Sequence, residues 1–96
     1  MKPSQALAIH RTDIRRVVES PRASNARVFG SVVNGDDSEG SDLDILIAPT
    51  PETTLFDIGA VRHELLQLLG APVDVLPPKA LPEKFRAVVL SGAVPV

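Results

Sequence analysis

The sequence contains no cysteine, tryptophan or tyrosine, and its aromatic side chains are three phenylalanines. The absence of cysteine excludes disulfide scaffolds, thiolate nucleophiles and cysteine-ligated zinc or iron–sulfur sites. With so few aromatic rings, the chain has almost no stacking platforms for single-stranded nucleic acid. No apolar run approaches the roughly 18 residues of a membrane span, and the first residues turn polar too early for a signal peptide. We therefore expect a cytoplasmic protein that does not bind membranes.

The composition that is present suits one globular domain over residues 1–96. The chain is 44% hydrophobic and 23% charged, and area scaling for its mass implies that about 64% of the surface is buried on folding. The net charge is only −2, but residues 30–47 hold five acidic residues and no lysine or arginine. Such an acidic block repels nucleic-acid phosphates unless metal ions intervene, so direct DNA binding is not expected.

Hydrophobic periodicity and the nine prolines divide the chain into short elements. In chain order they are a leading helix over 4–20 within residues 1–22, with Ser4 as N-cap and Pro21 after its end; a turn at Ser24–Asn25; a strand over 27–29; a loop or short helix over 31–41; a strand over 42–48; a helix from Thr53 or Thr54 to Leu69, ended by Gly70; a strand over 72–76; and a last helix over 82–92. This order predicts an α/β (α+β) fold with a small mixed three-stranded sheet and helices packed on it.

Three aspartates occupy unusual places in the predicted strands. Asp42 and Asp44 share one face of a strand whose other face is apolar, and Asp74 interrupts the apolar run Val-Asp-Val. Two carboxylates about 4 Å apart repel by roughly 4 kcal/mol at an effective dielectric constant near 20. If the two strands are neighbours, the three carboxylates meet and offer hard oxygen ligands to one or two Mg²⁺ ions. Two such ions support in-line phosphoryl or nucleotidyl transfer.

A Gly-Ser pair follows the first predicted strand. Gly30 lets the backbone approach a phosphate closely, and Ser31 adds a hydroxyl donor beside the exposed amides of the turn. Ser41 directly precedes the aspartate pair and is, with Gly30 and Ser31, a candidate cofactor-binding residue. Its hydroxyl either caps or orients the aspartate pair or belongs to an ordinary loop. Each feature is weak alone, but their order along the chain predicts adjoining triphosphate and metal sites.

These residues carry a family resemblance. The pattern Gly30-Ser31, Gly35, Ser41-Asp42-x-Asp44 and Val73-Asp74-Val75 resembles the minimal nucleotidyltransferases of the DNA polymerase β superfamily, over roughly residues 26–96. The resemblance implies a nucleotidyltransferase-like fold in which residues 26–48 carry the Gly-Ser and Asp-x-Asp motifs and residues 53–76 carry the third aspartate. It implies that Asp42 and Asp44 are metal ligands, that Asp74 is the third ligand near the attacking hydroxyl, and that Gly30 and Ser31 bind the phosphates. The chain has Val33 and Asn34 where the family pattern has Ala and Arg.

The resemblance also implies a toxin–antitoxin context. The expected activity is Mg²⁺-dependent transfer of AMP from ATP to a tyrosine of a partner HEPN-domain ribonuclease toxin. Two alternatives stay open: an antitoxin that neutralises its toxin by binding alone, and a transferase that acts on a small molecule or tRNA.

Other polar residues receive structural interpretations. The segment His63-Glu64-Leu65-Leu66-Gln67 lacks the second histidine of the zinc-protease signature, so no two-histidine zinc site is expected there. His10 has no evident partner in the sequence and is expected at the surface. The arginines of the first third indicate a solvated helix face or a docking surface for an acidic partner; they are Arg11, Arg15, Arg16, Arg22 and Arg27.

Overall fold

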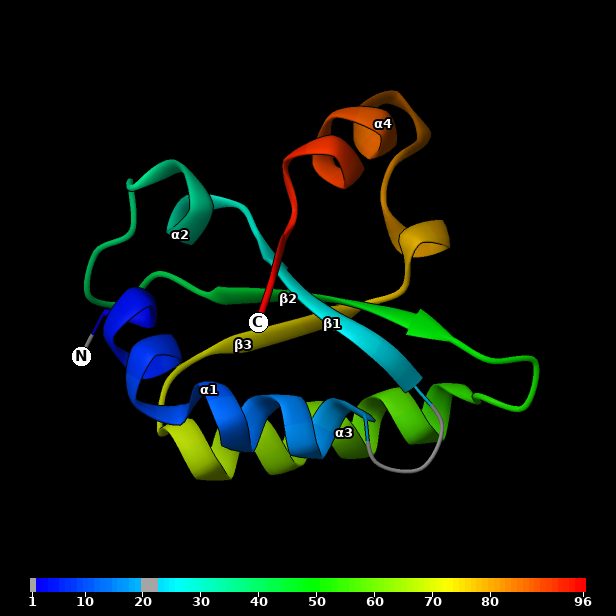
Figure 1. Cartoon of the computed structure of the whole chain (residues 1–96), viewed down its shortest axis with the longest axis horizontal. Coiled ribbons are helices and arrows are strands. Elements are labelled where there is room, and N and C mark those ends of the chain that lie inside the picture. The colour runs from blue at the N-terminus through cyan, green and yellow to red at the C-terminus, as the bar shows by residue number, and fades with distance from the viewer. Residues whose placement is uncertain (1, 20–22) are drawn as a thin grey trace.

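The computed structural model describes residues 2–19 and 23–96, which form a four-stranded sheet with helices on both sides (Figure 1). The elements are α1 (Pro3–Glu19), β1 (Ala23–Phe29), α2 (Ser31–Asn34), β2 (Leu43–Pro49), α3 (Leu55–Leu69), β3 (Val73–Leu76), the 3₁₀ helix η1 (Pro78–Ala80), α4 (Glu83–Gly92) and β4 (Val94–Pro95). The strand order is β3-β2-β1-β4, with β2 and β3 parallel and the other pairs antiparallel. The predicted mixed α/β fold is confirmed, with four strands in place of three.

The extra strand, β4, pairs with β1 at the C-terminal end of the chain. Its position is held by the backbone, because Val96 N–H donates to the carbonyl of Ala26 at 2.9 Å. Arg15 and Arg11 of α1 donate to the carbonyls of Val96 and Pro95 at 3.0 and 3.4 Å. These two arginines therefore connect α1 to the C-terminal residues as well as contributing to the solvated helix face. Two residues that include a proline carry no strand pattern, which is why periodicity missed β4.

The main core lies between the sheet and the pair α1 and α3, which cover one face together (Figure 1). Alternate residues of β2 point into it, so Leu43, Ile45 and Ile47 are fully buried. Leu46 of the opposite face is also fully buried, where η1 contacts β2. The face that carries Asp42 and Asp44 is thus separated from the main core, as the alternation predicts.

Both ends of α3 lie where the sequence predicts them. Thr54 is the N-cap in a capping box: its hydroxyl accepts from Asp57 N–H at 3.1 Å, and its own N–H donates to Asp57 Oδ2 at 2.8 Å. Gly70 ends the helix in the left-handed conformation, where a residue without Cβ is favoured. Interactions within a few residues of each end therefore determine where α3 begins and ends.

The start of α1 and the start of β1 differ from the predictions. Pro3 is the first residue of α1, so Ser4 is not its N-cap; Ser4 N–H donates to Asp37 Oδ2 at 2.9 Å, and this bond lowers the pKa of Asp37. The predicted turn at Ser24–Asn25 lies inside β1 as a register shift, with Asn25 at φ 53°. Asparagine tolerates this left-handed conformation, so a turn signal can mark a bulge. The predicted helix end at Pro21, with Arg22, lies outside the described residues.

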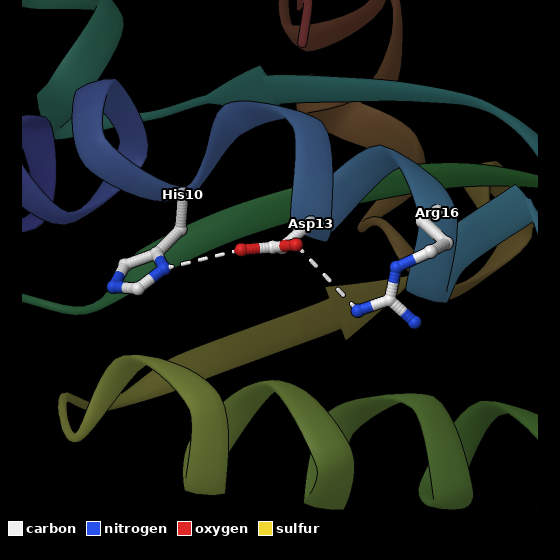
Figure 2. A network of polar contacts seen from close by, with 3 residues as sticks. All are labelled: His10, Asp13 and Arg16. Atoms are coloured by element: carbon white, nitrogen blue, oxygen red, sulfur yellow. Dashed lines mark ion pairs between the residues drawn. The ribbon is translucent and has the colours of Figure 1, made fainter.

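His10 has a partner that sequence reasoning missed. Figure 2 shows Asp13 between His10 and Arg16 along α1, with Asp13 oxygens 3.6 Å from His10 Nδ1 and 3.6 Å from Arg16 Nη2. The backbone of His10 departs from helical geometry, with φ −110° and ψ 17°. The expectation that His10 lacks a partner is wrong, because residues three apart on a helix are neighbours. His63, by contrast, is exposed on α3, as expected.

The last helix, α4, lies on the same side of the sheet as α2 and contains no buried residue (Figure 1). Its connection to η1 depends on Arg86, whose Nε donates to the carbonyl of Pro78 at 3.0 Å and whose Nη2 donates to that of Leu81 at 3.0 Å. No helix in the described part of the chain is long and apolar enough to cross a membrane.

Replacing Arg86 by alanine is expected to loosen α4 without unfolding the domain. The change removes the charge-assisted hydrogen bonds that join α4 to η1, and α4 has no buried side chain to compensate. Hydrogen exchange should become at least several-fold faster in residues 83–92 and stay unchanged in β2. Lys84→Ala, which removes an exposed positive charge from the same helix, is the control. Unchanged exchange in α4 would contradict this role of Arg86.

Candidate active site

The structure brings two of the three predicted carboxylates side by side. Asp44 of β2 and Asp74 of β3 are Cα partners in the parallel register of these strands. Both lie on the sheet face that points away from α1 and α3, because their strand neighbours Leu43, Ile45 and Val73 are buried in the main core. Asp42 directly precedes β2 and is exposed. The carboxylates therefore gather at one end of the parallel strand pair.

The electrostatics of Asp44 reflect this gathering. Burial raises the pKa of Asp44 to about 6, with further increases from the charges of Asp74 and then Asp42. Both causes disfavour the ionised carboxylate. The site thus holds more negative charge than it can stabilise by its own groups, and a bound cation would relieve this repulsion.

The glycine of the Gly-Ser pair touches this carboxylate. Gly30 has φ 78° and ψ −145°, a combination that is nearly confined to glycine. A Cβ atom at this position would collide with Asp44 Oδ2. The loop that enters α2 therefore passes directly over the Asp44 carboxylate, and Ser31 begins the helix there. This contact joins the two halves of the predicted site.

Ser41 serves the loop before β2. Its Oγ accepts from Ser38 N–H at 3.0 Å and lies 3.2 Å from Ser38 Oγ. These bonds close the turn over residues 38–41 that leads into Asp42. The Ser41 hydroxyl thus stabilises the turn that leads into Asp42. Of the two interpretations of Ser41 from the sequence, these bonds agree with the residue of an ordinary loop.

Arg62 of α3 is a site neighbour that sequence reasoning did not find. Its Nε donates to the carbonyl of Val73 at 3.1 Å and lies 4.0 Å from Asp74 Oδ1. Both side chains are about half exposed, at 52% and 49%, so the ion pair itself contributes little to stability. The contact places a positive charge beside the third carboxylate. No local sequence pattern indicates this contact, because Arg62 lies on α3 and Asp74 on β3, and the two meet only through the tertiary structure.

The carboxylates form a partial donor set for a divalent metal ion. Within residues 2–19 and 23–96, no three His, Cys, Asp or Glu side chains converge closely enough to hold a metal ion. Mg²⁺ at nucleotide sites is commonly held by one or two carboxylates together with substrate phosphates and waters. The adjacent Asp44 and Asp74, with Asp42 beside them, provide that partial shell, and the raised pKa of Asp44 marks its unneutralised charge.

The raised pKa of Asp44 predicts how stability depends on pH in the absence of divalent cations. The folded protein keeps a proton on Asp44 up to about pH 6, whereas the unfolded chain releases it near 3.8. The folded state thus binds more protons in this interval, so Asp44 lowers the stability as the pH rises from about 4 to about 6. In EDTA, the melting temperature of Asp44→Asn should increasingly exceed that of the unmodified protein as the pH rises across this interval. A flat difference would contradict the assigned pKa.

A groove adjoins the same loop. It has a volume of about 420 Å³ and lies at the end of β1, between α2 and α4, where Phe29 and Gly30 form part of its wall. Phe29 is the Cα partner of Asp44, so the groove and the carboxylates are neighbours across one strand pair. A second cavity of about 150 Å³ lies between α1 and α3, lined by residues that include Val17 and Val61, and contains none of the predicted site residues.

Comparison with known proteins decides the family. The model of the nucleotidyltransferase domain matches residues 11–94, nearly the whole chain. The chain belongs to the nucleotidyltransferase domain family. A relative from Methanocaldococcus jannaschii, the proposed protein adenylyltransferase MJ0435, is 34% identical over 71 residues, which are 74% of this chain and 76% of the relative. The resemblance inferred from Gly30-Ser31 and the aspartates is thereby confirmed at the level of the family.

Solved structures agree with this assignment. The nucleotidyltransferase superposes on a proposed minimal nucleotidyltransferase with a TM-score of 0.85 and 34% identity, covering 97% of this chain and 95% of the other. A toxin–antitoxin complex crystallised with AMP-PNP gives a TM-score of 0.68 at 16% identity, covering 96% and 70%. The toxin–antitoxin complex MntA–HpeT gives 0.71 at 17% identity, covering 90% and 70%. The last two likenesses show a shared fold.

Proposed function

We propose that this nucleotidyltransferase transfers AMP from ATP to a hydroxyl group of a partner protein, with a tyrosine of a HEPN-domain ribonuclease toxin as the acceptor. The observation that carries the proposal is the contact between the Gly30 loop and the Asp44 carboxylate, with Asp74 alongside on the next strand. The similarity to a proposed protein adenylyltransferase supports AMP and a protein acceptor. The toxin–antitoxin complexes that share the fold motivate the partner.

The chain's own residues account for positioning in this reaction. The backbone of Gly30 and Ser31, with the Ser31 hydroxyl, would bind the triphosphate oxygens over Asp44. The acceptor oxygen bonds to the α-phosphorus, the bond from that phosphorus to the bridging oxygen of pyrophosphate breaks, and the acceptor proton is released. Asp74, on edge strand β3, is open to an approaching hydroxyl because its side chain is 49% exposed.

The carboxylates Asp42, Asp44 and Asp74 would hold one or two Mg²⁺ ions. When bound, these ions neutralise charge on the triphosphate and polarise the α-phosphate. Arg62 lies next to Asp74, where its hydrogen bond to the Val73 carbonyl fixes the guanidinium at the edge of the sheet. This arrangement keeps a positive charge beside Asp74.

Metal and nucleotide are expected to bind together. Because no three carboxylates in the described residues converge on a ready metal site, Mg²⁺ alone should bind weakly, and the phosphates should complete its shell. In thermal-shift measurements, Mg²⁺ with the non-hydrolysable analogue AMP-PNP should stabilise the protein more than the sum of the two ligands separately. At 100 times the dissociation constant the stabilisation is about 2.7 kcal/mol. Additive shifts would contradict a shared site.

The decisive experiment is transfer to the partner. The protein is incubated with a candidate HEPN-domain partner protein, ATP labelled at the α-phosphate, and Mg²⁺. Label should appear on a tyrosine of the partner, and the double change Asp42→Asn with Asp44→Asn should remove it. Asp36→Asn, which neutralises an exposed acid of the loop before β2, is the matched control and should label normally. An unlabelled partner would refute the proposal.

Two other outcomes separate the alternatives. A variant with all three aspartates changed to asparagine that still neutralises the toxin and still co-purifies with it would indicate an antitoxin that acts by binding. This alternative is kept open by Asn34, which stands in the last turn of α2 where the family pattern has a positively charged arginine. Label on a small molecule or tRNA without any partner protein would indicate a different acceptor class.

A further inference from the structure

Two large apolar side chains of α4 are largely exposed. Phe85 is 54% exposed and Val88 is 72% exposed, in a helix that buries none of its residues. Both line the groove of about 420 Å³ that reaches Gly30. Exposed apolar groups that gather around a concave surface mark a binding site for a ligand or a partner.

The position of the groove favours the nucleotide over the acceptor. The sheet order places Phe29 on β1, Asp44 on β2 and Asp74 on β3, so the groove and Asp74 lie on opposite sides of Asp44. In the proposed function the acceptor hydroxyl approaches Asp74 over the β3 edge. The groove starts instead at Gly30, where the triphosphate is proposed to bind.

The size and chemistry of the groove suit a nucleoside. Its volume of about 420 Å³ lies in the range of small-molecule sites, which is roughly 300–1,000 Å³. Its walls are aromatic and aliphatic, with Phe29, Phe85 and Val88 among the lining residues, and Asn34 is the polar side chain in this set. Apolar walls recognise ring area, whereas a set of buried polar groups would be needed to distinguish one purine from another.

We propose that the groove between α2 and α4 holds the base and ribose of the nucleotide, and that Phe85 makes this nucleotidyltransferase prefer purine over pyrimidine nucleotides. The inference rests on the proposed function for the position of the triphosphate. An aromatic side chain that stacks on a base typically strengthens binding several-fold to about 100-fold. Because ring area determines the contact, ATP and GTP should bind within a few-fold of each other, and CTP and UTP roughly tenfold more weakly.

The test compares a nucleotide with its phosphates alone. Dissociation constants for ATP and for inorganic tripolyphosphate, both with Mg²⁺, are measured by calorimetry for the unmodified protein, Phe85→Ala and Phe56→Ala. Phe56 is the matched control, because it is a 90% exposed phenylalanine on α3, on the other side of the sheet (Figure 1). Phe85→Ala should weaken ATP binding about tenfold and leave tripolyphosphate binding unchanged. Phe56→Ala should change neither.

Each other result overturns the inference in a distinct way. Equal loss of ATP and tripolyphosphate binding in Phe85→Ala would mean that the side chain supports the helix and not the base. Unchanged ATP binding, with loss of transfer to the partner, would assign α4 to the acceptor protein. If the unmodified protein binds ATP no more tightly than tripolyphosphate, or CTP as tightly as ATP, the groove does not hold the base, while the proposed transfer remains intact. Failure of both ATP and tripolyphosphate to bind would refute the proposed function as well.

Discussion

Asp44→Asn is expected to reduce nucleotidyl transfer by about 1,000-fold or more while stabilising the metal-free protein at pH 8. Loss of this proposed metal ligand would remove several kcal/mol of transition-state stabilisation, and each 1.4 kcal/mol corresponds to a factor of ten. The same carboxylate is costly to the fold, because burial and the charges of Asp74 and Asp42 raise its pKa to about 6. The neutral amide has nearly the same shape and removes this repulsion.

The measurements are initial rates of transfer at saturating Mg²⁺ and ATP, and melting temperatures in EDTA. For a domain of this size, about 1 kcal/mol changes the melting temperature by roughly 4–8 °C, so an increase of several degrees is expected. Asp36→Asn removes an exposed acid of equal charge and should leave the melting temperature and the rate almost unchanged. A lower melting temperature for Asp44→Asn would show that the ionised carboxylate is stabilised by its surroundings. Normal activity would exclude Asp44 as a metal ligand.

Gly30→Ala is expected to impair both folding stability and transfer. The backbone at this position has φ 78° and ψ −145°, where a residue with a side chain costs about 1–3 kcal/mol. The added methyl group would also collide with Asp44 Oδ2. Either the loop or the carboxylate must move, and a displacement of about 1 Å at a reacting centre can cost about 100-fold in rate.

Gly35→Ala is the matched control for this substitution. Gly35 also has a positive φ, 75°, but a Cβ atom there meets no atom within 4 Å. This variant should lose about 1–2 kcal/mol of stability through backbone strain alone and keep most of its activity. Chemical denaturation and transfer rates measure the two effects separately. Equal loss of activity in the two variants would show that strain in the α2 region, and not the contact with Asp44, causes the defect.

Local signals predicted the elements whose chemistry lies within a few residues. The alternation in β2 separated Asp42 and Asp44 from Leu43 and Ile45, and the structure confirms this separation by burial. Thr54 and Gly70 defined the ends of α3 by capping. Where the signal was ambiguous, the prediction was wrong: the Ser24–Asn25 turn is a bulge within β1, since asparagine permits the same backbone conformation in both settings.

Contacts between residues far apart in the sequence were harder to predict from the sequence. The sequence predicted that Asp74 joins Asp44 only if their strands are neighbours. The two residues meet because β2 and β3 pair in parallel in a register that makes them Cα partners. Arg62 beside Asp74 and the strand β4 beside β1 have no local pattern at all. The groove needs α2 and α4, which are far apart in the sequence and lie on the same side of the sheet (Figure 1).

The sequence by itself indicated the family of this protein and its candidate site residues, because a Gly-Ser turn and acids within apolar strands are anomalies that folding alone does not favour. The tertiary structure decided how these residues meet. It placed the Gly30 backbone against Asp44, aligned Asp74 with that carboxylate, and formed a groove whose walls come from separate segments. The physical reason is that turn chemistry and side-chain alternation act over a few residues, whereas strand pairing and helix placement depend on burial of the whole core.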